Sequence, residues 1–283
     1  MGKVLRLKPM IGRELANSEE WVVVGENSFP FVVEKELAEQ LMSGELNKSE
    51  INHEIIDFIN DEKLLLSEGN QFISLVENNK LSFRIVQRGI FTLGVLSFVI
   101  VIISVFLLDI PTGNKLIYDG LSLPVNLVIL VVFSTVTTFF HELMHYFFSQ
   151  PMQTSKRVLH FHLLKGVASV EMSYIWAWSF FARLMAIFSG ILLDLILLAI
   201  LTVIQYISQN LFFELLRSVL WVRIIWQFQF QKSYDGFLLI SILKDDLFFN
   251  ENRKYQFYKW IGRFITLLLV VFWALPFIFA IIR

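Results

Sequence analysis

The sequence contains no cysteine among its 283 residues. Disulfide bonds and thiolate zinc sites are therefore excluded, and any bound metal must be held by histidine, aspartate or glutamate. The sequence also lacks a Gly-x-Ser-x-Gly elbow, a glycine-rich phosphate loop and a basic patch interleaved with aromatic residues. Nothing in it therefore indicates a serine hydrolase of that type, a nucleotide site or a nucleic-acid partner.

A formal net charge of −1 favours no class of partner, whereas hydrophobic residues make up 55% of the chain and 29 residues are phenylalanine. The mean hydropathy of +0.61 is typical of a polytopic membrane protein. The first eighty residues are mixed and charged, without a basic start followed by a short apolar block, so we predict no signal peptide.

Residues 1–85 are expected to form a cytoplasmic α+β domain. Turn-forming residues flanked by β-branched and aromatic ones predict a β-hairpin, and apolar residues at helical spacing predict two helices after it. The predicted elements are a hairpin of residues 21–24 and 29–33, helices at 34–42 and 51–61, and strands at 64–66 and 72–75.

This order of strands, helices and further strands resembles the small winged-helix-like peptide-recognition domains related to PqqD, which bind leader peptides of ribosomally made, modified peptides. The resemblance implies that the domain binds a peptide. The alternative is a cap that packs on the membrane domain, and the sequence favours neither.

Residues 86–283 are expected to form an all-α polytopic membrane domain with about five transmembrane helices. Each predicted span is an apolar run long enough to cross a hydrocarbon core of about 30 Å. The spans are predicted at residues 89–108, 124–149, 176–207, 211–230 and 260–282.

Basic residues collect on one side of these spans, whereas the opposite loops hold only Lys115, and the far terminus only Arg283. The positive-inside rule therefore predicts a multi-pass protein of the cell membrane with its N-terminus in the cytoplasm. The basic residues on the cytoplasmic side are Lys80, Arg84, Arg88, Lys156, Arg157, Lys165, Lys232, Lys244, Arg253, Lys254 and Lys259.

A His-Glu-x-x-His motif, from His141 to His145, lies near the end of the second predicted span. Residues four apart share one face of a helix, so both imidazoles can bind one Zn²⁺ while Glu142 lies beside a bound water. Two hydrogen-bonded core histidines are the structural alternative. An apolar membrane segment is a costly place for three polar groups without a function, which favours a metal site near the cytoplasmic face.

A catalytic zinc site needs a third protein ligand and an open position for water. Asp235 is the best placed carboxylate, because it follows the fourth span at the depth of His145, and Gly236 after it allows close backbone approach. Asp194, in the third span, is its rival. The other candidates are Glu171, Glu214, Asp245, Asp246 and Glu251.

Together these motifs resemble the site-2 protease family of intramembrane zinc metallopeptidases, including the peptide zinc metalloproteases encoded with bacterial peptide-modifying enzymes. That family pairs His-Glu-x-x-His with a distant Asp-Gly whose aspartate is the third ligand, which Asp235 and Gly236 match. It also has a β-hairpin after the zinc helix. Residues 157–166 and 167–174 have the alternation and the central Lys-Gly turn of such a hairpin.

The chain departs from the family pattern around the expected substrate groove. The family's Gly-Pro-x-x-Asn motif keeps Gly190 here but has Ile191 and Asp194 in place of proline and asparagine. Gln227 and Phe230 stand where the family commonly has asparagine and proline. The resemblance covers about residues 90–240 and implies a groove that differs in shape.

Arg223, Gln227 and Gln231 recur every four residues and form one polar stripe that leads to Asp235. The stripe either contacts the substrate backbone or water, or forms hydrogen bonds between helices. Asp194 is either a rival ligand or a hydrogen-bond partner of a ligand or of the substrate. Asp194 and the three stripe residues are the predicted substrate-binding set.

These residues predict a membrane-embedded zinc endopeptidase, with Zn²⁺ held by His141, His145 and Asp235 and with Glu142 as general base. The expected substrate is a membrane-associated protein or a modified precursor peptide, and a peptide-modifying enzyme or an exporter is a further candidate partner. Two alternatives are a His-Glu-x-x-His peptidase with a downstream glutamate ligand and a catalytically silent peptide-binding accessory or immunity protein.

Overall fold

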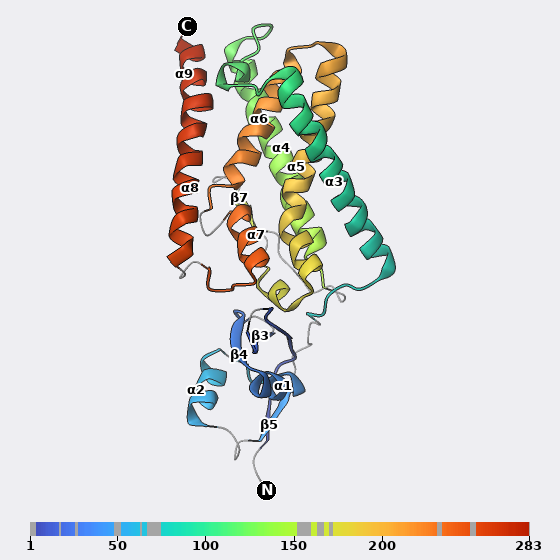
Figure 1. Ribbon diagram of the computed structural model, residues 1–283, viewed down its shortest axis with the longest axis vertical. Coiled ribbons are helices and arrows are strands. Elements are labelled where there is room, and N and C mark those ends of the chain that lie inside the picture. Colours follow the sequence, from blue (N-terminus) through green and yellow to red (C-terminus); the bar gives the residue numbers. More distant parts are fainter. Residues whose placement is uncertain are drawn as a thin grey trace.

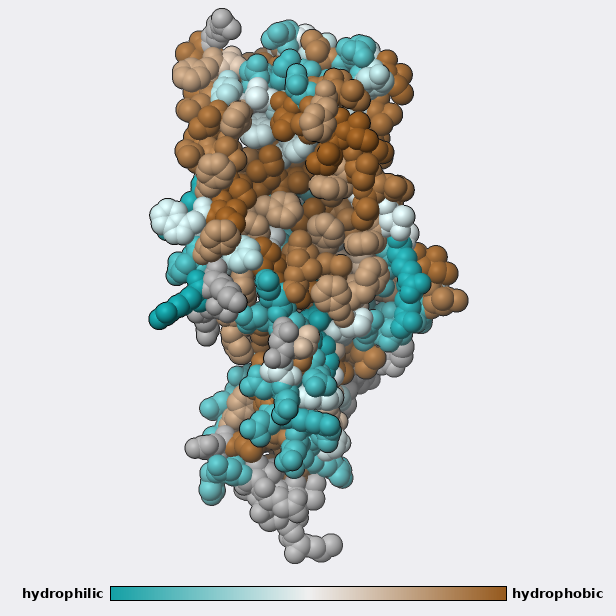
Figure 2. Space-filling model, viewed as in Figure 1, coloured by the Kyte–Doolittle hydropathy of each residue, from teal (hydrophilic) through white to brown (hydrophobic). Residues whose placement is uncertain are grey.

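The computed structural model describes residues 4–16, 18–25, 28–47, 52–62, 64–66, 75–151, 160–162, 167–169, 172–230, 234–249 and 253–282. A small α+β domain at the N-terminal end lies below a bundle of long helices, and the C-terminus lies at the opposite end of the molecule (Figure 1). The bundle carries apolar side chains over the face seen in Figure 2, whereas hydrophilic side chains gather over the N-terminal domain.

The N-terminal domain has two antiparallel sheets, one of order β2-β3-β4 and one that pairs β1 with β5. The predicted hairpin and both predicted helices are present, and α1 ends where Gly44 takes a left-handed conformation with φ of 76°. The elements are β1 (Val4–Arg6), β2 (Met10–Glu14), β3 (Glu20–Gly25), β4 (Phe31–Glu34), α1 (Lys35–Ser43), β5 (Glu45–Asn47) and α2 (His53–Asp61).

Strand predictions in this domain were incomplete. The sequence did not indicate β1, β2 or β5. β1 and β5 have three residues each and pair with each other across about forty residues, whereas β2 pairs with the neighbouring strand β3. Residues 64–66 form no strand of their own, because Leu65 makes only an isolated bridge to Leu7. The predicted strand at 72–75 lies outside the described residues except for Leu75.

The central strand β3 is buried on both faces, and this burial explains its run of three valines. Val23 packs in the core of the domain with Ala38 and Leu41 of α1. Val24 instead packs with Ile175 and other residues of the helical bundle. The N-terminal domain and the bundle therefore share a hydrophobic cluster.

Within the described residues, four helical runs are long and apolar enough to cross a membrane. They are α3 (Leu81–Leu108), α4 (Leu123–Phe148), α5 (Phe180–Ser208) and a last run, Tyr255–Ile282, that passes through α8 (Arg253–Leu269), the π-helical turn η5 (Val270–Ala274) and α9 (Leu275–Ile282). These runs coincide with the first, second, third and fifth predicted spans.

Helix α5 lies at the centre of the bundle and packs against α3, α4, α6 and α7. Its most apolar stretch is 61% buried, against 22% for α3 and 11% for α4, so α5 is the helix that the others surround. Small residues allow this close packing, because a Cβ atom at Gly94 of α3 would lie 2.4 Å from a methyl carbon of Leu192.

The fourth predicted span is not one of these long helices. Residues 211–230 correspond to α6 (Phe212–Gln227), whose 16 residues rise only about 24 Å. It includes Glu214, Arg217 and Arg223, so its composition is less apolar than that of the four long runs. After a break the chain starts again as the short helix α7 (Asp235–Lys244).

The 3₁₀ helix η1 (Gly113–Leu116) lies between α3 and α4 in the chain, and further short elements follow α4. An antiparallel pair, β6 (His160–His162) and β7 (Val167–Ser169), follows α4 where the sequence predicted a hairpin, although the predicted turn at 163–166 lies outside the described residues. The 3₁₀ helix η3 (Ser173–Ala177) occupies the start of the third predicted span, so α5 begins only at Phe180.

Candidate metal centre

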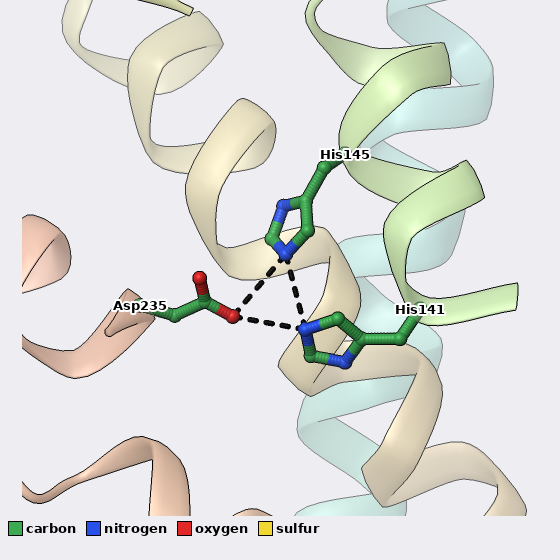
Figure 3. A group of neighbouring side chains, drawn as sticks. All are labelled: His141, His145 and Asp235. Carbon is green, nitrogen blue, oxygen red and sulfur yellow. Dashed lines mark hydrogen bonds and ion pairs between the residues drawn. The ribbon is translucent and has the colours of Figure 1, made fainter. Parts of the chain in front are cut away.

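The three predicted zinc ligands lie together in the bundle (Figure 3). His141 and His145 project from α4, and Asp235 is the first residue of α7. Oδ2 of Asp235 lies 2.9 Å from Nε2 of His141 and 3.2 Å from Nε2 of His145, and the two Nε2 atoms are 3.1 Å apart. Ligand atoms around tetrahedral zinc lie roughly 3.3 Å apart, so these atoms have nearly the required spacing.

The Nδ1 atom of each histidine ring forms a hydrogen bond with a neighbouring group. Nδ1 of His145 donates to the carbonyl oxygen of Ala186 at 2.8 Å, and Nδ1 of His141 donates to Oδ2 of Asp194 at 2.8 Å. Because a carbonyl oxygen and a carboxylate only accept hydrogen bonds, each neutral ring carries its proton on Nδ1. Both Nε2 lone pairs therefore face the Asp235 carboxylate.

Three acceptors thus converge on one point without a donor among them, which is unfavourable unless a cation lies between them. A single added proton would let one ring donate to Asp235 and would leave the other lone pair without a donor, whereas protonating both rings would put two positive imidazoles in direct contact. The donor set of two imidazole nitrogens and one carboxylate oxygen is a common one for catalytic zinc. The chemistry of the three residues therefore fits a metal ion.

Gly190 of α5 forms the wall behind the two histidines. A Cβ atom at this position would lie 2.5 Å from Nε2 of His141 and 2.6 Å from Nε2 of His145. Any side chain here would fill the space into which both lone pairs point. This lack of space explains why position 190, which matches the glycine of the family motif, holds a residue without a side chain.

Asp194 lies on the far side of the His141 ring from the converging atoms, and its side chain is fully buried. Arg223 of α6 donates to the same carboxylate from Nε at 3.0 Å and from Nη2 at 2.6 Å. Asp194 therefore orients His141 and fixes its protonation, in the manner of outer carboxylates at metal sites, rather than joining the three ligand atoms.

Among the residues that the structure describes, the remaining carboxylate candidates do not join this group. Glu214 pairs with Lys115 at 2.8 Å, and Asp245 pairs with Arg13 and Arg183. Asp246 accepts a hydrogen bond from the backbone of Phe248. Glu171 and Glu251 lie outside the described residues.

A cavity of about 540 Å³ opens beside the three side chains, between α4 and α6. Glu142 lines it next to His141, where the sequence predicts the general base. Arg223 and Gln227 of the polar stripe also line it, with apolar residues such as Trp226. Gln231, the last residue of the stripe, lies outside the described residues.

Arg223 forms the hydrogen bonds between helices that the sequence gave as one alternative, whereas its contact with substrate or water stays a prediction. It bonds between helices, through Asp194 of α5 and through the carbonyl oxygen of Thr137 of α4 at 2.8 Å, and it also lines the cavity. Sequence reasoning did not find Ala186, because any residue can supply a carbonyl oxygen. A signal was nevertheless present, since residues 186, 190 and 194 recur every four positions and share one face of α5.

The chain was compared with protein-family models, curated proteins and solved structures. No protein-family model, curated protein or solved structure matches the chain. The likeness to the site-2 protease family therefore stays a prediction from the sequence motifs.

Proposed function

We propose that this chain is a membrane-embedded zinc endopeptidase of the site-2 protease type. The observation that carries the proposal is the convergence of two histidine lone pairs and the Asp235 carboxylate against Gly190, with Glu142 beside them on a cavity. Zinc bound there would lower the pKa of its water to about 7 and polarise the scissile carbonyl.

The chain's own residues then have separate tasks. Glu142 accepts the proton of the attacking water and delivers it to the leaving amine. The Asp194 carboxylate, held by Arg223, keeps His141 in the tautomer that presents Nε2 to the metal. The low exposure of both histidines, 2% each, keeps bulk water away from the centre.

The substrate class follows from the reaction. A helical peptide hides its carbonyl groups, so the substrate presents an extended stretch, and the β6–β7 pair offers an edge for strand addition. A membrane-associated protein or a modified precursor peptide meets this requirement. The proposed orientation, with the N-terminus in the cytoplasm of a cell-membrane protein, puts the cleavage site near the cytoplasmic face.

Replacing Glu142 with glutamine tests the proposal directly. Wild-type protein, purified as the full chain in lipid nanodiscs, is expected to contain about one zinc per chain by elemental mass spectrometry. Glu142→Gln should retain that zinc and should co-purify with a bound peptide. Wild type should cleave this peptide at least about 100-fold faster than Glu142→Gln does.

Glu39→Gln, the same substitution at an exposed position of α1, is the control and should behave as wild type. A chain that binds zinc but shows no Glu142-dependent cleavage of the captured peptide, or of candidate precursor peptides, would contradict the peptidase and favour the silent peptide-binding accessory protein. A chain without zinc at these residues would contradict both the metal and the mechanism.

A further inference from the structure

The N-terminal domain and the bundle meet at a buried carboxylate, that of Asp245. Arg13 of β2 pairs with it through both terminal nitrogens, with Nη1 at 2.9 Å from Oδ2. Arg183 of α5 donates from Nη1 to Oδ1 at 2.5 Å, and the backbone N–H of Ala16 donates to Oδ2 at 2.8 Å. The Asp245 side chain is only 7% exposed, so these contacts are shielded from solvent.

Arg13 makes a further contact across the same boundary, because its Nε donates to the carbonyl oxygen of Trp176 at 2.7 Å. All three guanidinium nitrogens thus bond to the bundle. Removing one partner of a buried ion pair leaves the other charge buried without a counter-charge, which is strongly unfavourable, so this junction is a firm attachment.

Asp245 lies directly after the last residue of α7, and Asp235 is the first residue of the same helix. The ten residues of α7 rise about 15 Å along the helix axis. At the start of α7 the packing is equally close, since a Cβ atom at Gly236 would lie 2.5 Å from the carbonyl oxygen of Gln227. One short helix therefore joins the candidate metal ligand to the N-terminal domain.

Hydrophobic packing joins the same parts. Val24 of β3 and Ile242 of α7 belong to one buried cluster, and this cluster also contains Ala186 of α5. The carbonyl oxygen of Ala186 is the acceptor that orients His145. The N-terminal domain thus packs in the same cluster as residues of both helices that support the candidate ligands.

We propose that the N-terminal domain is a structural part of the metal centre: through Arg13 and Asp245 it fixes α7 and so positions Asp235 opposite His141 and His145. This inference rests on the metal centre of the proposed function. Arg13 and Asp245 are positioning residues, because they act on the metal only through α7. Ligand distances at a metal site tolerate only about ±0.2 Å, so a small shift of α7 is enough to weaken binding.

The test uses Co²⁺ as a spectroscopic probe of the full chain in nanodiscs. Visible absorption gives the Co²⁺ affinity, and competition with Zn²⁺ gives the Zn²⁺ affinity. Arg13→Met should weaken Co²⁺ binding about tenfold, at the lower end of the loss typical for residues outside the ligand set, and alter the absorption bands. Arg13→Lys keeps the charge but loses the planar guanidinium group. Its Co²⁺ affinity should lie between those of wild type and Arg13→Met.

Arg6→Met is the matched control, since Arg6 is an exposed arginine on β1 of the same domain, and it should bind Co²⁺ as wild type does. Thermal unfolding of every variant separates positioning from general stability. A lower unfolding temperature with wild-type Co²⁺ affinity and spectrum in Arg13→Met would overturn the inference. If Arg13→Met does not fold, Arg13→Lys and Asp245→Asn decide by the same criterion.

Asp235→Ala distinguishes failure of the metal centre from failure of the positioning role of the N-terminal domain. If wild type binds Co²⁺ no better than Asp235→Ala, the metal centre fails, and the inference fails with it. If wild type binds Co²⁺ in an Asp235-dependent way and the folded Arg13 variants bind equally well, only the positioning role of the N-terminal domain fails.

Discussion

At the scale of single residues, the candidate centre depends on one position with no side chain. Gly190 leaves open the space that two imidazole nitrogens face, so its role is steric and cannot be shared by any other residue type. Glycine inside a helix is otherwise unfavourable by about 0.5–1 kcal/mol relative to alanine. Alanine at position 190 would therefore favour the helix, whereas glycine is needed to leave space for a metal ion.

Gly190→Ala is expected to abolish zinc binding, because the new methyl group occupies the space between the ligand atoms. Gly89→Ala on α3 is the control, since a Cβ atom there would meet nothing within 4 Å. Zinc content by elemental mass spectrometry distinguishes the two variants. Retention of stoichiometric zinc by Gly190→Ala would show that the metal lies elsewhere.

Sequence reasoning grouped His141, His145 and Asp235, which the structure brings together, because the two motifs are specific in spacing and the ligand chemistry is limited to a few residue types. The role of Glu142 as general base stays a prediction. The protonation of the rings could not be read from the motifs. It depends on Asp194 and on the Ala186 carbonyl oxygen, which approach the histidines only after α5 has packed on α4.

At the scale of elements, the clearest difference from expectation is that α6 is too short to be a span like the four long runs. Apolar content predicted a single span over residues 211–230, but the charged residues in it make internal contacts rather than facing lipid. Arg217 is buried and bonds to Thr202 and Gln205 of α5, and Arg223 bonds to Asp194. A broken helix is tolerated within a bundle where its free backbone groups border a cavity.

Asp194 joins three helices, since it belongs to α5, accepts from His141 of α4 and pairs with Arg223 of α6. Asp194→Asn should therefore weaken Zn²⁺ affinity about tenfold or more and also lower the unfolding temperature, because Arg223 loses its buried counter-charge. Competition titration and thermal unfolding measure the two effects.

Asp119→Asn, at an exposed aspartate of the loop before α4, is the control and should change neither quantity. Unchanged Zn²⁺ affinity in Asp194→Asn would show that the hydrogen bond to His141 does not support metal binding.

At the scale of the whole molecule, composition predicted an α+β part followed by apolar helices, and the order of elements agrees with this prediction. How the two parts meet could not be predicted. The contact between Arg13 and Asp245 joins residues 232 positions apart, and neither residue belongs to a motif. Such long-range ion pairs carry no local sequence signal.

The pH dependence of this junction follows from Asp245. Burial opposes its ionisation, but hydrogen bonds from Arg13, the Ala16 backbone and Arg183 outweigh burial and lower the pKa of Asp245 to about 2. A carboxyl group whose pKa is depressed on folding stabilises the fold above its unfolded pKa of about 3.9 and loses that contribution as pH falls through its folded pKa.

The difference in unfolding free energy between wild type and Asp245→Asn should therefore be constant from pH 8 to 5, at about 3 kcal/mol, and shrink between about pH 4 and pH 2. Denaturant titration of both chains across this range measures the difference. A difference that already declines between pH 7 and 5 would show that Asp245 is not held by these partners.

The position of Asp235, 90 residues after His145, also sets an order of events during synthesis. A ribosome adds about 5–20 residues each second, so both histidines precede their carboxylate partner by roughly 5–18 s. The N-terminal domain is complete before either. During this interval the nascent chain holds the two histidines without Asp235, so the candidate metal centre can form only after most of the protein has been made.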